Sequence, residues 1–303
     1  MKKTFTETDF SKIRRFLCIG AHCDDTEIRA GTVARRLIRQ GAEGMEWTMI
    51  DCPWCGALES GSEPRRKAAD LIALRTGENR KAAAVLGMKE LRFFHLRAWH
   101  LYRAECGLED LRGFRFDFPD FSSPEALAGT AGPAVYTGRP MSIFAARQAE
   151  FSREFREALE AAAPDVIFTH SMDDRHIEHY AVSTLVLEAV QASEKLRGTP
   201  VLMWHPGGAG SAMSYLPTHF IEVAGEDVEQ ATEAMRCYGS QFSRKILDNY
   251  VSGNSRAYGR LCGKDYAAAF TLAFRPAMSL AGNPEQYILE EYRKCPEPAV
   301  IPL

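Results

Sequence analysis

The sequence predicts an α/β fold in which helices cover both faces of a mostly parallel β-sheet, giving three layers. Short apolar runs of strand length alternate along the chain with longer segments whose apolar residues recur at helical spacing. This alternation is typical of a doubly wound parallel sheet. Clusters of His and Asp follow two of the predicted strands, at the edge where open parallel sheets bind ligands. The expected architecture is Rossmann-like, and 303 residues that are 46% hydrophobic suffice for one such domain.

The predicted elements follow one another with few interruptions. A buried strand is expected at about 15–21, because Phe16 to Gly20 is an apolar run, and a helix at 27–41 because apolar side chains recur there every three or four residues. The same patterns predict strands at 45–51, 90–95, 164–170, 199–204 and 218–224, and helices at 64–87, 142–162, 176–194, 226–238 and 254–272.

A long irregular stretch, about 97–140, interrupts this alternation. It is rich in Gly, Pro, Asp and Phe, and a loop of that length is usually functional or an insertion. Its aromatic residues between Phe114 and Phe121 either form a wall for a sugar ring or anchor the loop to the core. We therefore expect a single domain over 1–303 that carries this loop or insertion.

Composition narrows the class of protein. The net charge is −3 and the Lys and Arg residues are scattered, so nucleic-acid binding has little support. No apolar run reaches about 18 residues, so we expect no integral membrane segment. The first residues lack an apolar signal region, and the eight Cys have irregular spacing, so we expect a cytoplasmic protein. A homo-oligomer is a possible state.

The first cluster is the segment HCDDTEI at residues 22–28, between the first strand and the first helix. Neighbouring Asp24 and Asp25 point in different directions at such a turn, so one can bind a metal while the other faces a metal-bound water. The alternative is helix capping, for which Asp and Thr are ordinary residues.

The second cluster follows the strand at 164–170. His176 and His179 lie three residues apart at the start of a helix and so share a face, although an HxxH pair alone can be a surface coincidence. Together with His22 and one Asp, one of these His residues would complete a three-ligand set. Three protein ligands with one open position are the pattern of a catalytic zinc ion.

These segments resemble a known family. Residues 22–28 are similar to the HPDDxEI signature of the PIG-L/LmbE-like zinc-dependent N-deacetylases, and 174–179 to their DRHPDH segment. Residues 75–87 resemble the RxxE…AAxxLG helix and 236–242 the RCYxSQ element, so the resemblance runs from about 16 to 270. It implies a metal-dependent amidohydrolase that removes an acetyl group from an N-acetylglucosamine-like amino sugar or conjugate.

The resemblance also implies roles for individual residues. The implied Zn²⁺ ligands are His22, Asp25 and His179. Asp24 would be the general base that accepts a proton from the metal-bound water, and protonated His176 would stabilise the oxyanion. Three further side chains, Arg75, Arg175 and Glu178, are expected at the substrate.

Four departures from the family pattern bear on the substrate more than on the metal. Cys23 replaces a Pro, Arg29 replaces a Gly in a shortened turn, and Glu178 replaces the Asp that often orients the oxyanion His. The segment at 96–100 lacks the family's Pro-Asp-Gly, so an acidic sugar-binding position is lost. We therefore expect a modified pocket and a conjugate rather than the free sugar.

Other functions stay open at this stage. A non-sugar N-acyl amide could be the substrate, or the chain could bind a ligand without catalysis. Cys52 and Cys55 form a CxxC pair that could be redox-active, but no second pair accompanies it, and chance or loop packing is the favoured explanation. Of the remaining His residues, His170 and His205 are those most expected to line a pocket.

Overall fold

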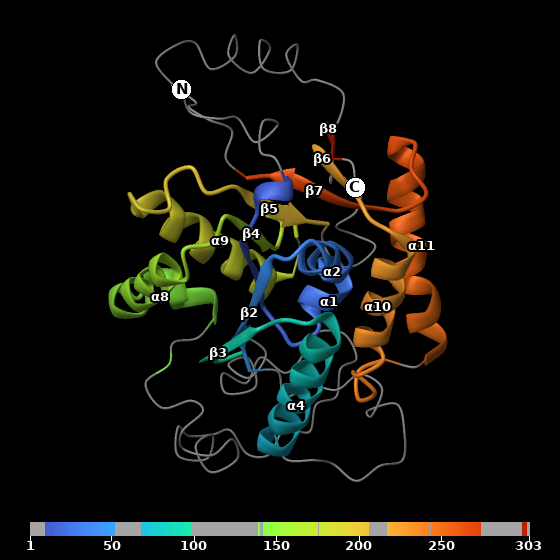
Figure 1. Ribbon diagram of the computed structural model, residues 1–303. Coiled ribbons are helices and arrows are strands. Elements are labelled where there is room, and N and C mark those ends of the chain that lie inside the picture. The colour runs from blue at the N-terminus through green and yellow to red at the C-terminus, as the bar shows by residue number, and fades with distance from the viewer. Residues whose placement is uncertain are drawn as a thin grey trace.

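The computed structural model describes residues 10–51, 68–98, 139, 142–174, 176–205, 217–242, 244–273 and 299–301. These segments form an eight-stranded sheet with helices on both faces (Figure 1). The strands are β1 (Arg15–Gly20), β2 (Glu43–Ile50), β3 (Glu90–Leu96), β4 (Val166–Thr169), β5 (Val201–Trp204), β6 (His219–Glu222), β7 (Ala267–Leu272) and β8 (Ala299–Ile301). The helices are α1 (Asp25–Arg29), α2 (Gly31–Arg39), α4 (Ala68–Leu86), α8 (Ala149–Ala162), α9 (Ile177–Ala192), α10 (Gly225–Met235) and α11 (Arg244–Cys262), with 3-10 helices η2 (Phe10–Lys12) and η3 (Ser142–Arg147).

The strand order creates a crevice beside β1. The order is β3-β2-β1-β4-β5-β7-β6-β8, and β1 to β5 are parallel to one another. The chain leaves β1 toward β2 and β3, then returns to place β4 on the other side of β1, with Ile19 opposite Thr169. Such a reversal is where ligands bind in open α/β sheets. The residues that follow β1 and β4 therefore emerge side by side.

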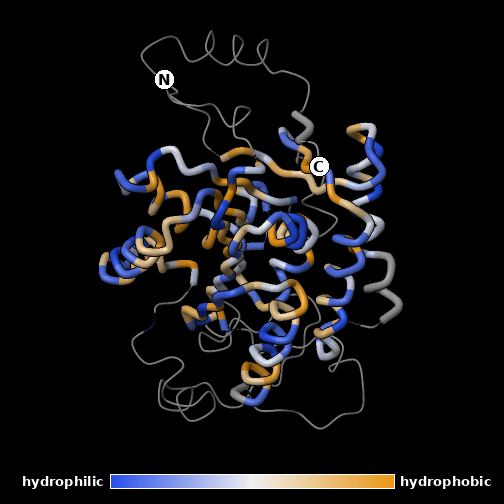
Figure 2. The backbone as a smooth tube through the Cα atoms, viewed as in Figure 1, coloured by the Kyte–Doolittle hydropathy of each residue, from blue (hydrophilic) through white to orange (hydrophobic). Residues whose placement is uncertain are grey.

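Each face of the sheet has its own core because successive strand residues point to opposite faces. In β1, Leu17 and Ile19 join the cluster that contains Phe155 of α8 and Val186 of α9. Phe16 and Cys18 face the other way, into a cluster with side chains of α2. Figure 2 shows hydrophobic residues concentrated along the central strands, between helices that are partly hydrophilic. The mostly parallel three-layer α/β fold predicted from the sequence is confirmed.

The prediction of a helix over 254–272 is wrong in its second half. Helix α11 begins earlier, at Arg244, and ends at Cys262, and Gly263 follows with a φ of 72°. Residues 267–272 form β7 instead, which pairs antiparallel with both β5 and β6. The run Ala267-Ala268-Ala269 favours a helix by propensity, but pairing inside the sheet overrides that preference.

Smaller differences concern element boundaries. The helix expected at 142–162 is divided at Gln148 into the 3-10 helix η3 and α8. The helix expected at 27–41 is divided at Ala30 into α1 and α2. Strand β8 was not predicted, and it pairs parallel with β6 at the edge of the sheet. Most of the expected loop at 97–140, the pair Cys52 and Cys55, and Arg175 lie outside the described residues. Within the described part of the chain, none of the helices combines the length and the apolar character needed to span a membrane.

Candidate active site

The site lies at the carboxyl ends of β1 and β4, and its first component is the turn from β1 into α1. Asp24 begins this helix with a φ of 128°, which is an uncommon backbone conformation for a residue with a side chain. The backbone N–H of His22 donates to Asp25 Oδ2 at 2.7 Å, which closes the turn. Conformations of this kind concentrate at functional sites, where the surrounding structure maintains them.

Three side chains from two distant segments converge here. His22 Nδ1 lies 3.3 Å from His179 Nε2, and both nitrogens lie near the Asp25 carboxylate, at 3.6 Å and 3.5 Å. His22 and Asp25 flank the end of β1, whereas His179 lies in the first turn of α9. The donor atoms of the three residues all lie within 4.8 Å of one another, so the set could hold a metal ion.

Two further carboxylates fix the orientation of the imidazole rings. His22 Nε2 donates to Glu178 Oε2 at 2.7 Å, and His179 Nδ1 donates to Asp174 Oδ2 at 2.8 Å. When a metal ion displaces any proton from the inner nitrogens, His22 Nδ1 and His179 Nε2 can both direct lone pairs to the same point. Carboxylate partners on the distal ring nitrogens are the usual outer shell of a metal-binding His. The donor set therefore fits a divalent cation with nitrogen and oxygen ligands.

His22 and Asp25 stabilise each other's charged forms. Burial alone would lower the pKa of His22, but its hydrogen bonds to Asp25 and Glu178 outweigh burial and raise that pKa well above its ordinary value. Burial would raise the pKa of Asp25, but the neighbouring His179 and His170 rings lower it well below its ordinary value. Asp25 therefore stays ionised, as a metal ligand must be.

A second buried His supports Asp25 from behind. His170 Nε2 lies 3.2 Å from Asp25 Oδ2, and the Ala21 backbone N–H points at that nitrogen as a hydrogen-bond donor, at 2.9 Å. The other ring nitrogen, Nδ1, accepts a hydrogen bond from the Trp204 indole at 3.1 Å. Both ring nitrogens therefore face an N–H donor, and a neutral ring accepts at only one of them. We assign the ring hydrogen to Nε2, because that tautomer accepts from Trp204 and donates to Asp25, whereas the other would accept only from Ala21 and set the lone pair of Nε2 against Asp25. Burial, and second the nearby His179, lower the pKa of His170 to about 4, so the ring is neutral.

Asp24 is held by Arg75 beside the donor set. Arg75 is 1% exposed, and its Nη2 donates to Asp24 Oδ2 at 2.6 Å and to the Cys23 carbonyl. Burial raises the pKa of Asp24, and the charge of Arg75 offsets part of that rise. Arg75, expected from the sequence at the substrate, thus contacts Asp24 here. Cys23 packs into the apolar cluster around Tyr238.

His176 and Glu178 flank the same ring of His22. The His176 ring stacks on His179 at a centroid distance of 4.2 Å and meets His22 edge-on at 5.1 Å. Loss of hydration beside these rings, and second the charge of His22, lower the pKa of His176 to about 3, although its side chain still reaches solvent. Glu178 is 2% exposed and bonds His22 and Ser142, at 2.7 Å and 3.2 Å. The structure thus brings together His22, Asp24, Asp25, Arg75, His176, Glu178 and His179.

Sequence reasoning assigned no role to Asp174, Trp204 or Ser142. Asp174 accepts from the His176 backbone N–H at 2.9 Å as well as from His179. Its place in a polar loop directly after β4 was the available signal. Trp204 ends β5 and looks like any buried aromatic residue in the sequence, so only the strand order shows that it reaches His170.

A buried acidic network lies behind the turn. Asn79 Nδ2 donates to Glu46 Oε1 at 2.7 Å and to the Tyr238 hydroxyl at 2.8 Å. Burial is the main reason that the pKa of Glu46 rises to about 7, and burial together with Glu46 raises the pKa of Glu27 well above its ordinary value. Oε2 of Glu46 and Oε2 of Glu27 have no hydrogen-bond partner among the described residues. Asn79 Nδ2 also lies 3.4 Å from Glu27 Oε1, so the network contacts α1 two residues beyond Asp25.

The fold and the convergent donors define a Rossmann-like α/β protein with a candidate metal centre. The chain belongs to the PIG-L family, whose model, described as GlcNAc-PI de-N-acetylase, matches residues 17–190. The match contains every residue of the donor set, from His22 to His179. Among curated proteins, no significant relative was found.

Solved structures share the fold at low sequence identity. N,N'-diacetylchitobiose deacetylase from Pyrococcus horikoshii is 17% identical with a TM-score of 0.62, and the match covers 93% of each chain. Teicoplanin deacetylase Orf2, in a zinc-inhibited form, is 17% identical with a TM-score of 0.54 over 86% of this chain and 98% of its own. GalB, the 4-carboxy-2-hydroxymuconate hydratase of Pseudomonas putida KT2440, is 16% identical with a TM-score of 0.60 over 89% and 100%. At these identities the likeness shows the fold alone.

Proposed function

We propose that the protein is a zinc-dependent hydrolase that removes an acetyl or related acyl group from the amide nitrogen of an N-acetylglucosamine-like amino sugar or conjugate. One observation carries the proposal. His22 Nδ1, His179 Nε2 and the Asp25 carboxylate face one point, and the distal ring nitrogens are already bonded to carboxylates. Family membership and the deacetylases among the structural neighbours support the same reaction.

The proposed ligands of the ion are His22, Asp25 and His179. A bound zinc ion would supply Lewis acidity and lower the pKa of a coordinated water toward about 7. Asp25 brings negative charge to the ligand set. His170 contacts Asp25 and Glu178 contacts His22, so both would orient the ligands without binding the ion themselves.

Asp24 is the proposed general base. It lies next to a proposed ligand without belonging to the donor set, and Arg75 holds one of its oxygens at 2.6 Å. Its raised pKa favours a carboxylate that accepts the proton of the attacking water and returns it to the leaving amine. Arg75 would position the base, and a direct substrate contact by Arg75 or Arg175 stays a prediction.

His176 is the proposed oxyanion donor. Its ring stacks on His179 and reaches solvent, so one edge is available to a substrate carbonyl. A ring N–H of His176 would donate a hydrogen bond to the developing oxyanion. Protonation of His176 during the reaction, which the family resemblance implies, stays a prediction.

The same fold serves a hydratase, so the reaction must be tested directly. We expect purified protein to contain one zinc ion per chain, and His179→Ala to lose it because two ligands hold zinc weakly. Acetate release from a panel of N-acetylated sugars and glycosides then tests the reaction. Full zinc occupancy in His179→Ala would refute the ligand set.

If the zinc-loaded protein hydrolyses none of the N-acyl amino sugars, that result would favour the alternative, hydrolysis of a non-sugar N-acyl amide. The redox alternative is tested separately by replacing Cys52 and Cys55 together with Ser. We expect zinc content and hydrolysis to be nearly unchanged, because the proposed reaction uses no thiol. A large loss of hydrolytic activity in this variant, reproduced by a reductant in the parent protein, would instead support a redox function.

A further inference from the structure

A second pair of His and carboxylate lies at the carboxyl ends of β2 and β3, outside the donor set. His95 Nδ1 lies 2.9 Å from Asp51 Oδ1 and 3.2 Å from Oδ2. Asp51 is 4% exposed, whereas 39% of the His95 side chain is exposed. Burial raises the pKa of Asp51, and the hydrogen bond to His95 offsets part of that rise. A buried carboxylate thus orients an imidazole ring that reaches solvent.

The backbone at His95 has an uncommon conformation. Its φ is 56°, in the left-handed region, although the residue belongs to β3. The register between β2 and β3 shifts between Thr48 and Ile50, so the pairing is irregular where the His95–Asp51 pair forms. Asp24, the first residue of the turn into α1, also has a positive φ. Such conformations concentrate at functional sites, and these two residues lie at the same edge of the sheet.

Asp51 determines what the His95 ring offers to a ligand. Because a carboxylate only accepts, the neutral ring carries its hydrogen on Nδ1 and presents a lone pair on Nε2. Within the described ranges, His95 Nε2 has no hydrogen-bond partner. A hydroxyl group can donate to this nitrogen. An anion would instead face a lone pair with the Asp51 carboxylate behind it, which is unfavourable.

The His95–Asp51 pair lies two strand spacings from the candidate metal site. The backbone N–H of Ile50 donates to the Ala21 carbonyl at 2.9 Å, so the residues after β1 and β2 emerge side by side. Ile50 in turn pairs with Leu96 of β3. Since neighbouring strands are about 4.8 Å apart, the backbones of His95 and His22 are separated by roughly 10 Å along this edge.

His95 and Asp24 also share one face of the sheet. The His95 ring lies beside Phe93, with 6.2 Å between centroids, and Phe93 packs against the cluster that contains Cys23 and side chains of α4. Asp24 follows Cys23 and is held by Arg75 of α4. A molecule with its reacting group beside Asp24 could therefore extend to His95 without crossing the sheet.

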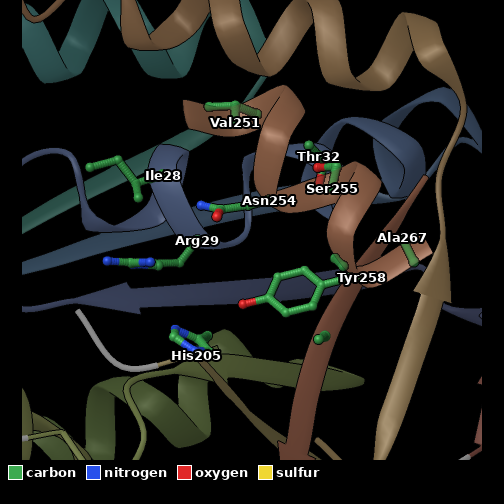
Figure 3. A pocket seen from close by; sticks show the side chains of 11 residues that line it. Ile28, Arg29, Thr32, His205, Val251, Asn254, Ser255, Tyr258 and Ala267 are labelled. Carbon is green, nitrogen blue, oxygen red and sulfur yellow. The ribbon is translucent and has the colours of Figure 1, made fainter. Parts of the chain in front are cut away.

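The opposite flank of the metal site provides a matched comparison. His205 follows β5 and lines a hollow between α1 and α11, together with Val251 and Tyr258 (Figure 3). β3 and β5 lie on opposite sides of β1 in the sheet. A group bound at His95 is therefore on the other side of the metal site from this hollow, and His205 can serve as a control.

We propose that His95, oriented by Asp51, is a specificity-determining residue that accepts a hydrogen bond from a hydroxyl of the sugar while the N-acyl group lies at the metal site. The inference rests on the proposed function and deepens it. Asp51 is a positioning residue, because it acts on the substrate only through the His95 ring.

The first test removes one hydroxyl at a time from the substrate of the zinc-loaded protein. The probes are methyl N-acetylglucosaminide and its 3-deoxy, 4-deoxy and 6-deoxy analogues, at pH 8. His95→Asn removes the imidazole but tolerates a φ of 56°, and His205→Asn is the matched control. In the parent protein and in His205→Asn we expect one analogue to lose about three- to tenfold in kcat/KM, the effect of one hydrogen bond. In His95→Asn this difference should disappear. Hydrolysis with the same deoxy-to-parent ratios in all three proteins overturns the proposal but supports the reaction.

The second test needs no hydrolysis and uses spectra of the protein with ¹⁵N-labelled His. We expect one fixed His95 tautomer, with the hydrogen on Nδ1, in the parent protein and a mixture in Asp51→Asn, because an amide can donate or accept. Methyl N-acetylglucosaminide should shift the His95 Nε2 signal, and one deoxy analogue should not. This shift without hydrolysis of any sugar supports the hydroxyl site and counts against the reaction. A ring hydrogen on Nε2 in the parent, or a signal that no sugar shifts, overturns the proposal.

Discussion

His22 and Glu178 are joined by a hydrogen bond of 2.7 Å between Nε2 and Oε2, although 156 residues separate them in the sequence. The bond directs the other ring nitrogen of His22 toward His179 and Asp25. Glu178 stands where the resembled family has Asp, and its longer side chain reaches the proposed ligand His22. Glu178 thus supports the donor set through His22.

Removing this carboxylate should weaken metal binding. We expect Glu178→Ala to raise the zinc Kd about 10- to 100-fold, the usual effect of losing an outer-shell partner. Glu178→Gln should lose less zinc affinity than Glu178→Ala, because its amide oxygen can still accept a hydrogen bond from His22. Competition with a chromophoric chelator measures both, and Glu150→Ala, an exposed position on α8, is the control. Equal zinc affinities in Glu178→Ala and Glu150→Ala would contradict this role.

Substitutions of Asp24 and Asp25 should affect catalysis and metal binding differently. Asp24→Asn should retain zinc and the fold while turnover falls by about two orders of magnitude or more, the scale for losing a general base. Asp25→Asn should lose tight zinc binding. Metal analysis with acetate release distinguishes the two, and zinc loss in Asp24→Asn with retention in Asp25→Asn would mean that the roles are reversed.

The sequence predicts the fold well where local pattern and tertiary environment agree. Apart from Arg15 and Thr169 at their ends, β1 and β4 are apolar because both of their faces are buried, and that pattern needs no long-range knowledge. The pattern fails at 267–272, where an Ala-rich run forms a strand because β5 and β6 pair with it. Propensity cannot detect partners that lie about 50 or more residues away.

The residues of the donor set can be predicted from the sequence, because two motifs place His and Asp directly after strands. Their supporting residues are harder to find. Asp174 and Trp204 are common residue types in ordinary positions, and their roles depend on the strand order β1-β4-β5. Arg75 illustrates a different limit: its motif predicts importance, but only packing shows that the guanidinium is buried against Asp24.

The Trp204 indole should fix the tautomer of His170. Trp204→Phe retains an aromatic ring but removes the N–H donated to Nδ1, so the ring hydrogen no longer has to occupy Nε2. We expect ¹⁵N spectra of labelled His to show one fixed tautomer in the parent and a mixture in the variant, with zinc affinity reduced a few-fold. Trp47→Phe, a buried Trp in the α8–α9 cluster, is the control for lost ring volume. A fixed tautomer in Trp204→Phe would contradict the assignment.

Glu46 should make stability depend on pH. Its pKa rises from 4.5 to about 7 in the folded protein, mainly through burial, so the folded state holds a proton that the unfolded chain releases. This contribution is fully present below about pH 4.5 and is lost as the pH rises through about 7. At about 1.4 kcal/mol per pKa unit, the loss is on the order of 3 kcal/mol.

Glu46→Gln removes this titration and should therefore lose less stability than the parent as the pH rises. Urea unfolding of the zinc-loaded proteins at pH 5, 6, 7 and 8 measures the difference, and the titration of the metal-site residues is common to both proteins. Glu157→Gln, at an exposed position on α8, should follow the parent curve. Parallel curves for Glu46→Gln and the parent would show that Glu46 is ionised in the fold, with its charge stabilised beyond the hydrogen bond from Asn79.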